Sequence, residues 1–292
     1  MSFDLAAYSA EARRVVDDDV DYTAFERQPL SDSALRALRY MSDVESHTIC
    51  YLRDLLVTPS HLDPKITTFL TMWAYEEFWH GEVLDKVLAA HGRTVGPERI
   101  GRLRRSQGRK DRFAPIIQGL AANLVGEDFI AVHMTFGAIN EWSTHAGYGR
   151  LLAKEDHPEM TKVVSRIQWQ ETRHVAFYTS QARERLERSR AARVLTRLVL
   201  QAWWTPVGST IMPRSETMFL LRYLMGGAEG ARVIQQLDDK IDRLPGLAGL
   251  QLVSRAAGDF GVGPRAGLRK PSLGQRVGAP LWSVLRSPML SR

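Results

Sequence analysis

The sequence contains few of the features that build cross-linked, membrane-spanning or β-rich proteins. Cys50 is the single cysteine in 292 residues, so the chain has no intrachain disulfide framework and no thiolate metal site. No apolar run reaches the roughly 18 residues typical of a transmembrane helix, and residues 1–22 lack the apolar core of a signal peptide. Alternating β-branched runs and Asn-Gly or Asp-Gly turns are also missing. These absences predict an all-α, cytoplasmic protein without a transmembrane span.

The chain does contain a repeated pair of acidic and histidine residues within apolar helical patterns. Glu77 and His80 are three positions apart, and so are Glu171 and His174. This spacing places both side chains of a pair on one face of a helix, about one turn apart. One such pair alone is weak evidence for a site, because glutamates are common. Two such pairs, each on the apolar face of a predicted helix, are much stronger evidence for a site.

A lone glutamate precedes each pair at a similar distance, again within an apolar helical pattern. Glu45 stands 32 residues before Glu77, and Glu141 stands 30 residues before Glu171. Four helices that turn these groups inward would surround two metal ions with four carboxylates and two imidazoles. Burying so many ionisable groups without a metal would be very costly. The pattern therefore predicts a di-metal site inside a ferritin-like four-helix bundle.

Helical geometry also predicts how the six ligands divide between the ions. The glutamates of the two pairs would bridge both metals. Glu45 with His80 would complete one ion, and Glu141 with His174 would complete the other. Oxygen-rich ligands with two imidazoles suit two iron ions, with manganese as the alternative. A buried iron pair with open positions is suited to binding and reducing O2.

Two further residues are candidates for supporting the ligands. A histidine bound to metal usually donates its second ring N–H to an acceptor. Glu76 and Gln170 stand directly before the two bridging glutamates, so we predict that they accept these hydrogen bonds.

Helical periodicity predicts four long helices, near residues 33–57, 64–92, 127–153 and 158–187. The longest connection joins the second helix to the third, which is typical of two αα-hairpins linked by one crossover. Within it, residues 93–112 are basic and predict an irregular surface segment, and residues 113–125 predict an apolar helix. The predicted regions are an N-terminal arm (1–30), the bundle (31–190), C-terminal helices packed on it (191–257) and a Gly-, Pro- and Arg-rich tail (258–292).

The chain has a net charge of +6, and some of its basic residues form two clusters. The clusters are Arg102, Arg104, Arg105, Arg109, Lys110 and Arg112, and Arg183, Arg185, Arg188, Arg190, Arg193 and Arg197. Such clusters favour an acidic partner or simply form a solvated basic surface. No helix-turn-helix, zinc-finger or aromatic RNA-binding pattern accompanies them, so we expect no nucleic acid partner. Trp203 and Trp204 lie beside basic residues and leave peripheral membrane contact open, although packing on the bundle is favoured.

The residues around the pairs resemble the soluble acyl-acyl carrier protein desaturases. The family's first motif reads like W-x-A-E-E-N-R-H-G, and residues 73–81 read WAYEEFWHG; residues 141–144, 153–155 and 171–178 read EWST, AKE and ETRHVAFY. The resemblance covers roughly residues 38–187. Gln170 stands where the family has an aspartate, and Phe78-Trp79 replace Asn-Arg.

This resemblance implies a homodimeric di-iron enzyme that inserts a double bond into a carrier-bound acyl chain. It implies acyl carrier protein, or another acyl carrier, and a ferredoxin-like electron donor as partners. Thr144 matches a threonine that lies beside the iron site in the family and assists O2 and proton handling there. Its structural alternative is a hydroxyl that bonds the carbonyl one turn earlier in its own helix.

Three other functions remain open at this point. The first is a di-iron monooxygenase that hydroxylates another metabolite; its N-oxygenase branch adds a histidine where this chain has Ile167. The second is a non-catalytic ferritin-like iron-binding protein, which the long segment after the bundle disfavours. The third is a scaffold that holds no metal.

Overall fold

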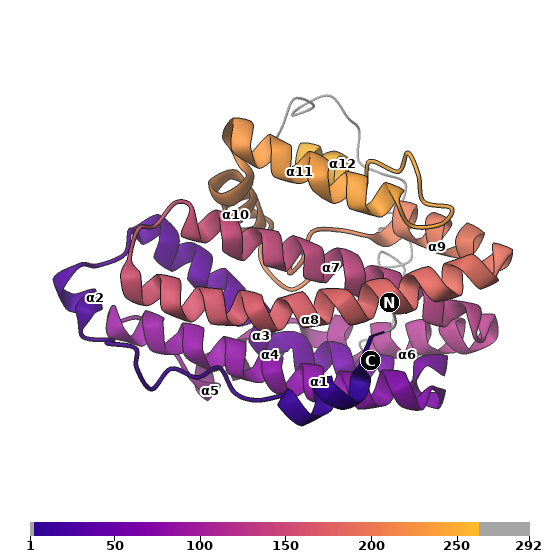
Figure 1. Cartoon of the computed structure of the whole chain (residues 1–292), viewed down its shortest axis with the longest axis horizontal. Helices are drawn as coiled ribbons and strands as arrows, with labels where there is room; N and C mark the ends of the chain where they lie inside the picture. Colours follow the sequence, from indigo (N-terminus) through magenta and orange to yellow (C-terminus); the bar gives the residue numbers. More distant parts are fainter. Residues whose placement is uncertain (1–2, 263–292) are drawn as a thin grey trace, which may run out of the picture.

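The computed structural model describes residues 3–262, apart from the side chains of residues 109–115, 117 and 118. Within these residues the chain forms twelve α-helices and one short 3-10 helix, and no strand (Figure 1). The all-α fold class is thereby confirmed. None of the helices described combines the length and apolar content needed to cross a bilayer.

Four long helices form the central bundle, close to the predicted positions. They are α3 (Asp32–Leu55), α4 (Pro64–Ala90), α7 (Asp128–Leu152) and α8 (Pro158–Arg188). Ser31 and Asp63 cap α3 and α4 with their side-chain oxygens, and His157 caps α8 through its ring nitrogen. Proline occupies the first position of α4 and of α8, where its missing N–H is not needed. These local signals explain why the sequence located the helix starts well.

Two glycines allow the helices of each hairpin to approach closely. A Cβ atom at Gly81 of α4 would lie 2.7 Å from Ser46 Oγ of α3. A Cβ atom at Gly137 of α7 would lie 2.2 Å from the ring of Tyr178 of α8. Each glycine lies within a turn of a predicted metal ligand, His80 in the first case and Glu141 in the second. The close approach therefore brings the ligands of neighbouring helices toward one another.

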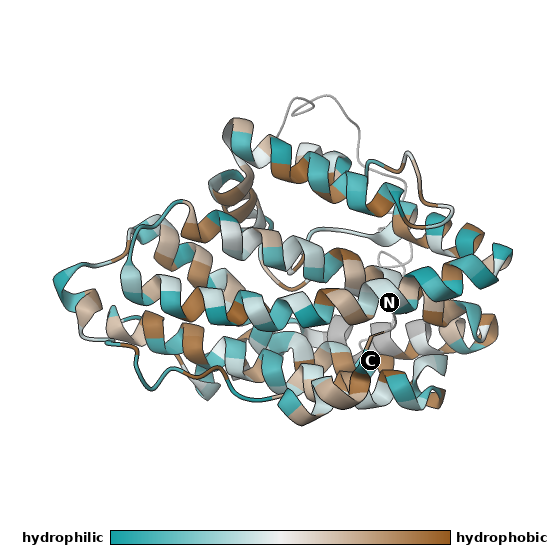
Figure 2. Cartoon of the chain, viewed as in Figure 1, coloured by the Kyte–Doolittle hydropathy of each residue, from teal (hydrophilic) through white to brown (hydrophobic). Residues whose placement is uncertain are grey.

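Apolar residues fill the bundle on both sides of its middle. One cluster includes Phe69, Met134 and Phe177, and the other includes Leu38 and Leu84, all nearly inaccessible to solvent. Hydrophilic and hydrophobic residues alternate around the visible helices, as amphipathic helices require (Figure 2). The six predicted ligands fall between the two clusters along the helices. Any charge at this level is shielded from water at both ends.

The crossover between α4 and α7 is helical, so the prediction of an irregular segment at 93–112 is wrong. It contains α5 (Pro97–Ser106) and α6 (Gly108–Val125). Arg99 forms ion pairs with Asp43 and, at 3.3 Å, with Asp85, and it is largely buried. Arg104 donates to the carbonyl of Ser46 at 2.7 Å. Basic residues that read as solvated in the sequence thus attach α5 to the bundle.

The chain after the bundle forms a layer that packs over α7 (Figure 1). Its helices are α9 (Arg190–Trp203), α10 (Arg214–Met225), α11 (Gly227–Asp242) and α12 (Leu252–Asp259). Trp204 is buried and donates to Asn140 Oδ1 of α7 at 3.2 Å, whereas Trp203 is exposed. Phe260 and Val262 are also buried, so the start of the predicted tail packs on the body. Residues 263–292 of that tail lie outside the described residues.

The N-terminal arm lies along the bundle rather than apart from it. It contains the short helices α1 (Leu5–Glu11) and α2 (Ala24–Arg27). Tyr8 and Phe25 are buried, and α1 packs against α4. The arm therefore covers one side of the central site.

Candidate metal centre

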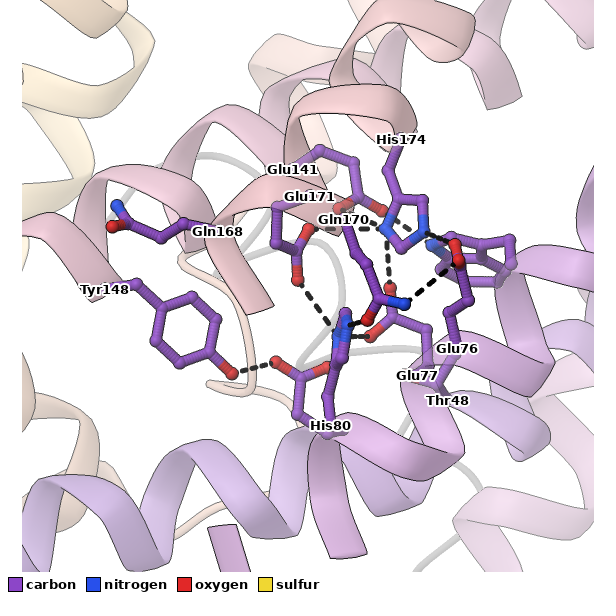
Figure 3. A network of polar contacts seen from close by, with 12 residues as sticks. Thr48, Glu76, Glu77, His80, Glu141, Tyr148, Gln168, Gln170, Glu171 and His174 are labelled. Atoms are coloured by element: carbon purple, nitrogen blue, oxygen red, sulfur yellow. Dashed lines mark hydrogen bonds and ion pairs between the residues drawn. The ribbon is translucent and has the colours of Figure 1, made fainter. Parts of the chain in front are cut away.

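The structure brings all six predicted ligands together in the interior of the bundle. All of them except Glu45 are labelled in Figure 3. All six side chains are buried, with exposed fractions of 6% or less. They form two sets in which the donor atoms lie within 4.8 Å of one another. The sets are Glu45, Glu77, His80 and Glu171, and Glu77, Glu141, Glu171 and His174. Glu77 and Glu171 belong to both sets, which is the arrangement that two bridging carboxylates require.

Both histidines direct Nδ1 toward the two shared carboxylates. His80 Nδ1 lies 3.5 Å from Glu77 Oε2 and 3.3 Å from Glu171 Oε1. His174 Nδ1 lies 3.2 Å from Glu77 Oε1 and 3.4 Å from Glu171 Oε2. The two ring nitrogens and the two carboxylates thus face a common centre from α4 and α8. The i, i+3 spacing of each motif produces this convergence directly.

The outer nitrogen of each histidine, Nε2, contacts one of the two predicted partners. Each of these contacts joins one hairpin to the other. His80 Nε2 lies 2.9 Å from Gln170 Oε1, and His174 Nε2 lies 2.8 Å from Glu76 Oε2. Each histidine is therefore held by the residue that precedes the bridging glutamate of the opposite hairpin. With Nε2 bonded outward, Nδ1 is left to face the centre of the site.

Glu76 is the centre of a larger network that the sequence did not predict. Its carboxylate accepts from the Tyr8 hydroxyl at 2.9 Å and from Arg173 Nη2 at 2.5 Å. The amide of Gln170 also donates to it, at 3.2 Å. The guanidinium of Arg173 stacks on the rings of Tyr8 and Trp169, with its carbon 5.0 and 4.3 Å from the ring centres. The N-terminal arm thus takes part in positioning His174.

Two aromatic residues hold the unshared glutamates. Tyr148 donates its hydroxyl to Glu45 Oε1 at 2.6 Å, and Trp73 Nε1 donates to Glu141 Oε1 at 3.0 Å. Tyr148 follows Glu141 by seven positions and so lies on the same helix face, a signal that could have identified it. Trp73 is the first residue of the motif at residues 73–81, but that motif does not indicate its bond to Glu141. Each bond crosses from one hairpin to the other.

Without a metal, protons neutralise this cluster. Burial and the nearby Glu77 hold the pKa of Glu45 well above its usual range, and burial with Glu171 does the same for Glu141. Burial opposes ionisation of Glu171, but the two histidines, whose Nδ1 atoms lie 3.3 and 3.4 Å from its oxygens, lower its pKa to about 2. Burial also opposes protonation of His80, yet the two shared carboxylates beside it raise its pKa to about 9.

The donor set fits two divalent cations. Four ionised carboxylates carry four negative charges, which two divalent ions balance, so the buried site becomes neutral. Both oxygens of Glu171 and the Nδ1 atoms of His80 and His174 are buried without a hydrogen-bond partner. Unpaired buried polar atoms are costly. These are the same atoms that would coordinate the ions, so metal binding would satisfy them.

Thr144 lies beside this site, at the edge of an apolar cavity. The cavity is also lined by Glu45, and it lies between the bundle and the C-terminal layer. Ser143, its neighbour, donates its hydroxyl to the Ile139 carbonyl of its own helix at 2.7 Å. Thr144 and Glu45, a predicted ligand, thus line the same cavity.

Comparison with known proteins identifies no relative. No family model, no curated protein and no solved structure matches the chain. The buried acidic and histidine residues can hold metal ions, and the resemblance to desaturases stays a prediction from the quoted motifs.

Proposed function

We propose that this chain is a di-iron, O2-dependent oxidase of the acyl-carrier-protein desaturase type, which inserts a double bond into a carrier-bound acyl chain. The observation that carries the proposal is the pair of buried four-residue donor sets that share Glu77 and Glu171. Iron is favoured over zinc because the donors are carboxylates and imidazoles without thiolates. When bound, an iron pair supplies the reduction of O2 needed to remove hydrogen from an unactivated carbon.

The residues of the chain have separate tasks in this reaction. Glu76 and Gln170 fix the orientation of His174 and His80 through their Nε2 atoms. The apolar clusters above and below the site exclude water. Thr144 places a hydroxyl at the boundary between the ligands and the cavity, where it can relay a proton. The cavity accepts the apolar part of the substrate, as its lining requires.

Acidic carrier and electron-donor proteins would dock on a basic surface. Of the second arginine cluster, Arg185 pairs with Asp63, and Arg193 and Arg197 donate to backbone carbonyls, so these guanidiniums serve the fold. In the first cluster Arg102 and Arg105 are exposed, and in the second Arg183, Arg188 and Arg190 are exposed. We assign docking to the α5 side, because α5 packs on α3, which carries the predicted ligand Glu45. Charge reversal at both positions should weaken carrier binding at low salt, and reversal at Arg188 and Arg190 should not; equal effects contradict the assignment.

Metal analysis followed by acyl-chain mass spectrometry tests the function. The purified chain should contain two irons, and O2 with an electron donor should remove two hydrogens from a carrier-bound acyl chain. Gain of one oxygen instead would identify a hydroxylase. A chain that takes up no iron, or only zinc, would contradict the proposal. Glu171→Gln serves as the control, because it removes a shared ligand.

A further inference from the structure

An apolar cavity of ≈ 90 Å³ lies between the bundle and the C-terminal layer. One water needs only about 10–15 Å³ by the same measure, so the cavity has room for part of an organic ligand. The bundle contributes residues of α3 and α7 to its lining, and α10, α11 and α12 contribute the opposite wall, mostly with aliphatic side chains. Its apolar lining favours an apolar ligand.

One end of the cavity reaches the metal centre. Glu45 and Thr144 line it, and both come from the bundle. Gly147 follows Thr144 on α7 by three residues, Met41 precedes Glu45 on α3 by four, and both also line the cavity. A ligand that extends from the metal centre into the cavity therefore passes Gly147 within about 5 Å of rise along the helix.

Gly147 differs from Gly81 and Gly137, which allow close helix contacts, in what surrounds it. At Gly81 and Gly137 an added Cβ would collide with the facing helix, at 2.7 and 2.2 Å. At Gly147 an added Cβ would meet Met41 Cε at 3.4 Å and Leu224 Cδ1 at 3.8 Å, which are ordinary contacts. Helix packing therefore does not require this glycine, although glycine costs a helix interior about 1 kcal/mol relative to alanine. Its missing side chain leaves space in the cavity instead.

We propose that Gly147 is a specificity-determining residue: its missing side chain keeps open the part of the cavity that holds an unbranched alkyl chain beyond the metal centre. The inference rests on the proposed function for the identity of the ligand. Any side chain larger than alanine at this position extends toward Leu224 and closes the passage one turn beyond Thr144. The C-terminal layer then acts as the wall against which the far end of the chain packs.

The test measures binding of saturated fatty acids of increasing length to the metal-free, full-length protein by calorimetry. Gly147→Leu should weaken binding of the long fatty acids by about tenfold or more, because contacts to about two methylene groups are lost. Binding of the short fatty acids should be nearly unchanged. Gly147→Ala should shift the preferred length slightly toward shorter chains. Its fold should be as stable as the original or more stable, so it tests the proposal even if the leucine variant unfolds.

Gly149→Leu is the matched control on the same helix. Gly149 lies two residues further along, and an added Cβ there would approach the flexible amide of Gln168 at 3.2 Å rather than the cavity. It should leave the length dependence unchanged. Loss of affinity by the same factor at every length, or an equal effect of the control, would overturn the inference. Because binding is measured without metal, this result is independent of iron content, which alone decides the proposed function.

Discussion

The two hairpins of the bundle present nearly equivalent ligands with different surroundings. In the α3–α4 half, His80 bonds outward to the neutral amide of Gln170. In the α7–α8 half, His174 bonds to the carboxylate of Glu76, which also accepts from Arg173 and Tyr8. A histidine whose outer N–H bonds to a carboxylate is a more basic ligand and binds a metal ion more strongly through its other ring nitrogen. The repeated sequence motif therefore produces two metal positions that we expect to differ in affinity.

The halves also differ in what lies beyond the ligands. The cavity reaches Glu45 and thus the first half of the site. The second half is covered by the arm and by the stacked side chains of Tyr8, Arg173 and Trp169. The cavity and the supporting network therefore adjoin different halves of the candidate site. The nearly symmetric set of Glu and His residues has asymmetric surroundings.

Loss of a shared ligand should have the largest effect. Glu171→Gln removes a carboxylate that both sets use, so the chain should retain neither ion at stoichiometric level. Glu45→Gln removes a ligand of the first set only, so about one ion per chain should remain at His174, which has the anionic partner. Metal content after dialysis distinguishes the two results. Equal losses in both variants would show that the ions bind as one unit.

Removal of the anionic partner should cost more stability than removal of the neutral one. Glu76→Gln removes the buried carboxylate that pairs with Arg173 and leaves it only the exposed Glu11, which should lower the free energy of unfolding by about 3 kcal/mol. Gln170→Leu removes amide hydrogen bonds and should cost about 1–2 kcal/mol. Urea unfolding of the metal-free variants measures both changes. Equal losses of unfolding free energy in the two variants would show that the anionic and the neutral histidine partner contribute equally to stability.

The stability of the metal-free protein should depend on pH in opposite directions through His80, which lies inside the site, and His133, which lies outside it. The raised pKa of His80, about 9, contributes stability that is full below pH 6.5 and is lost as the pH rises through about 9. Burial, with Arg185, lowers the pKa of His133 to about 3, so its contribution is lost as the pH falls from 6.5 toward 3. The loss of stability at high pH through His80 is the alkaline limb, and the loss at low pH through His133 is the acid limb. Each loss amounts to a few kcal/mol in the free energy of unfolding.

Urea unfolding across this range measures the two limbs. His80→Gln should flatten the alkaline limb alone, and His133→Gln should flatten the acid limb alone. A variant that changes the opposite limb would show that the sign of its pKa shift is wrong.

The smallest expected difference concerns the glycines that set the helix spacing. Gly137→Ala would place a methyl group 2.2 Å from the rigid ring of Tyr178 and should destabilise the chain by about 2–3 kcal/mol. Gly81→Ala meets a serine hydroxyl at 2.7 Å, which can rotate away, so about 1 kcal/mol is expected. Thermal unfolding compares them. If Gly81→Ala is the more harmful, the α3–α4 hairpin is the less adaptable half.

The sequence alone determined the four long helices of the bundle and the six Glu and His residues that cluster inside it. Caps and prolines mark where α3, α4 and α8 begin, and the three-residue spacing in each motif fixes which side chains share a face. Both signals are local, because they depend only on the geometry of one helix. The predicted partners Glu76 and Gln170 follow from the same local reasoning, since they adjoin the ligands.

Only the tertiary structure decided which side chains of different helices form hydrogen bonds with one another. His80 meets Gln170, His174 meets Glu76, and Tyr148 meets Glu45, all across hairpins. Such pairs depend on the register and spacing of helices that are far apart in the sequence. The same holds for α5, which Arg99 attaches to the bundle, and for Tyr8, which arrives from the arm. Gly147 is ambiguous in the sequence, because a glycine can mark a close helix contact or an empty space; its neighbours in three dimensions show that it leaves a space.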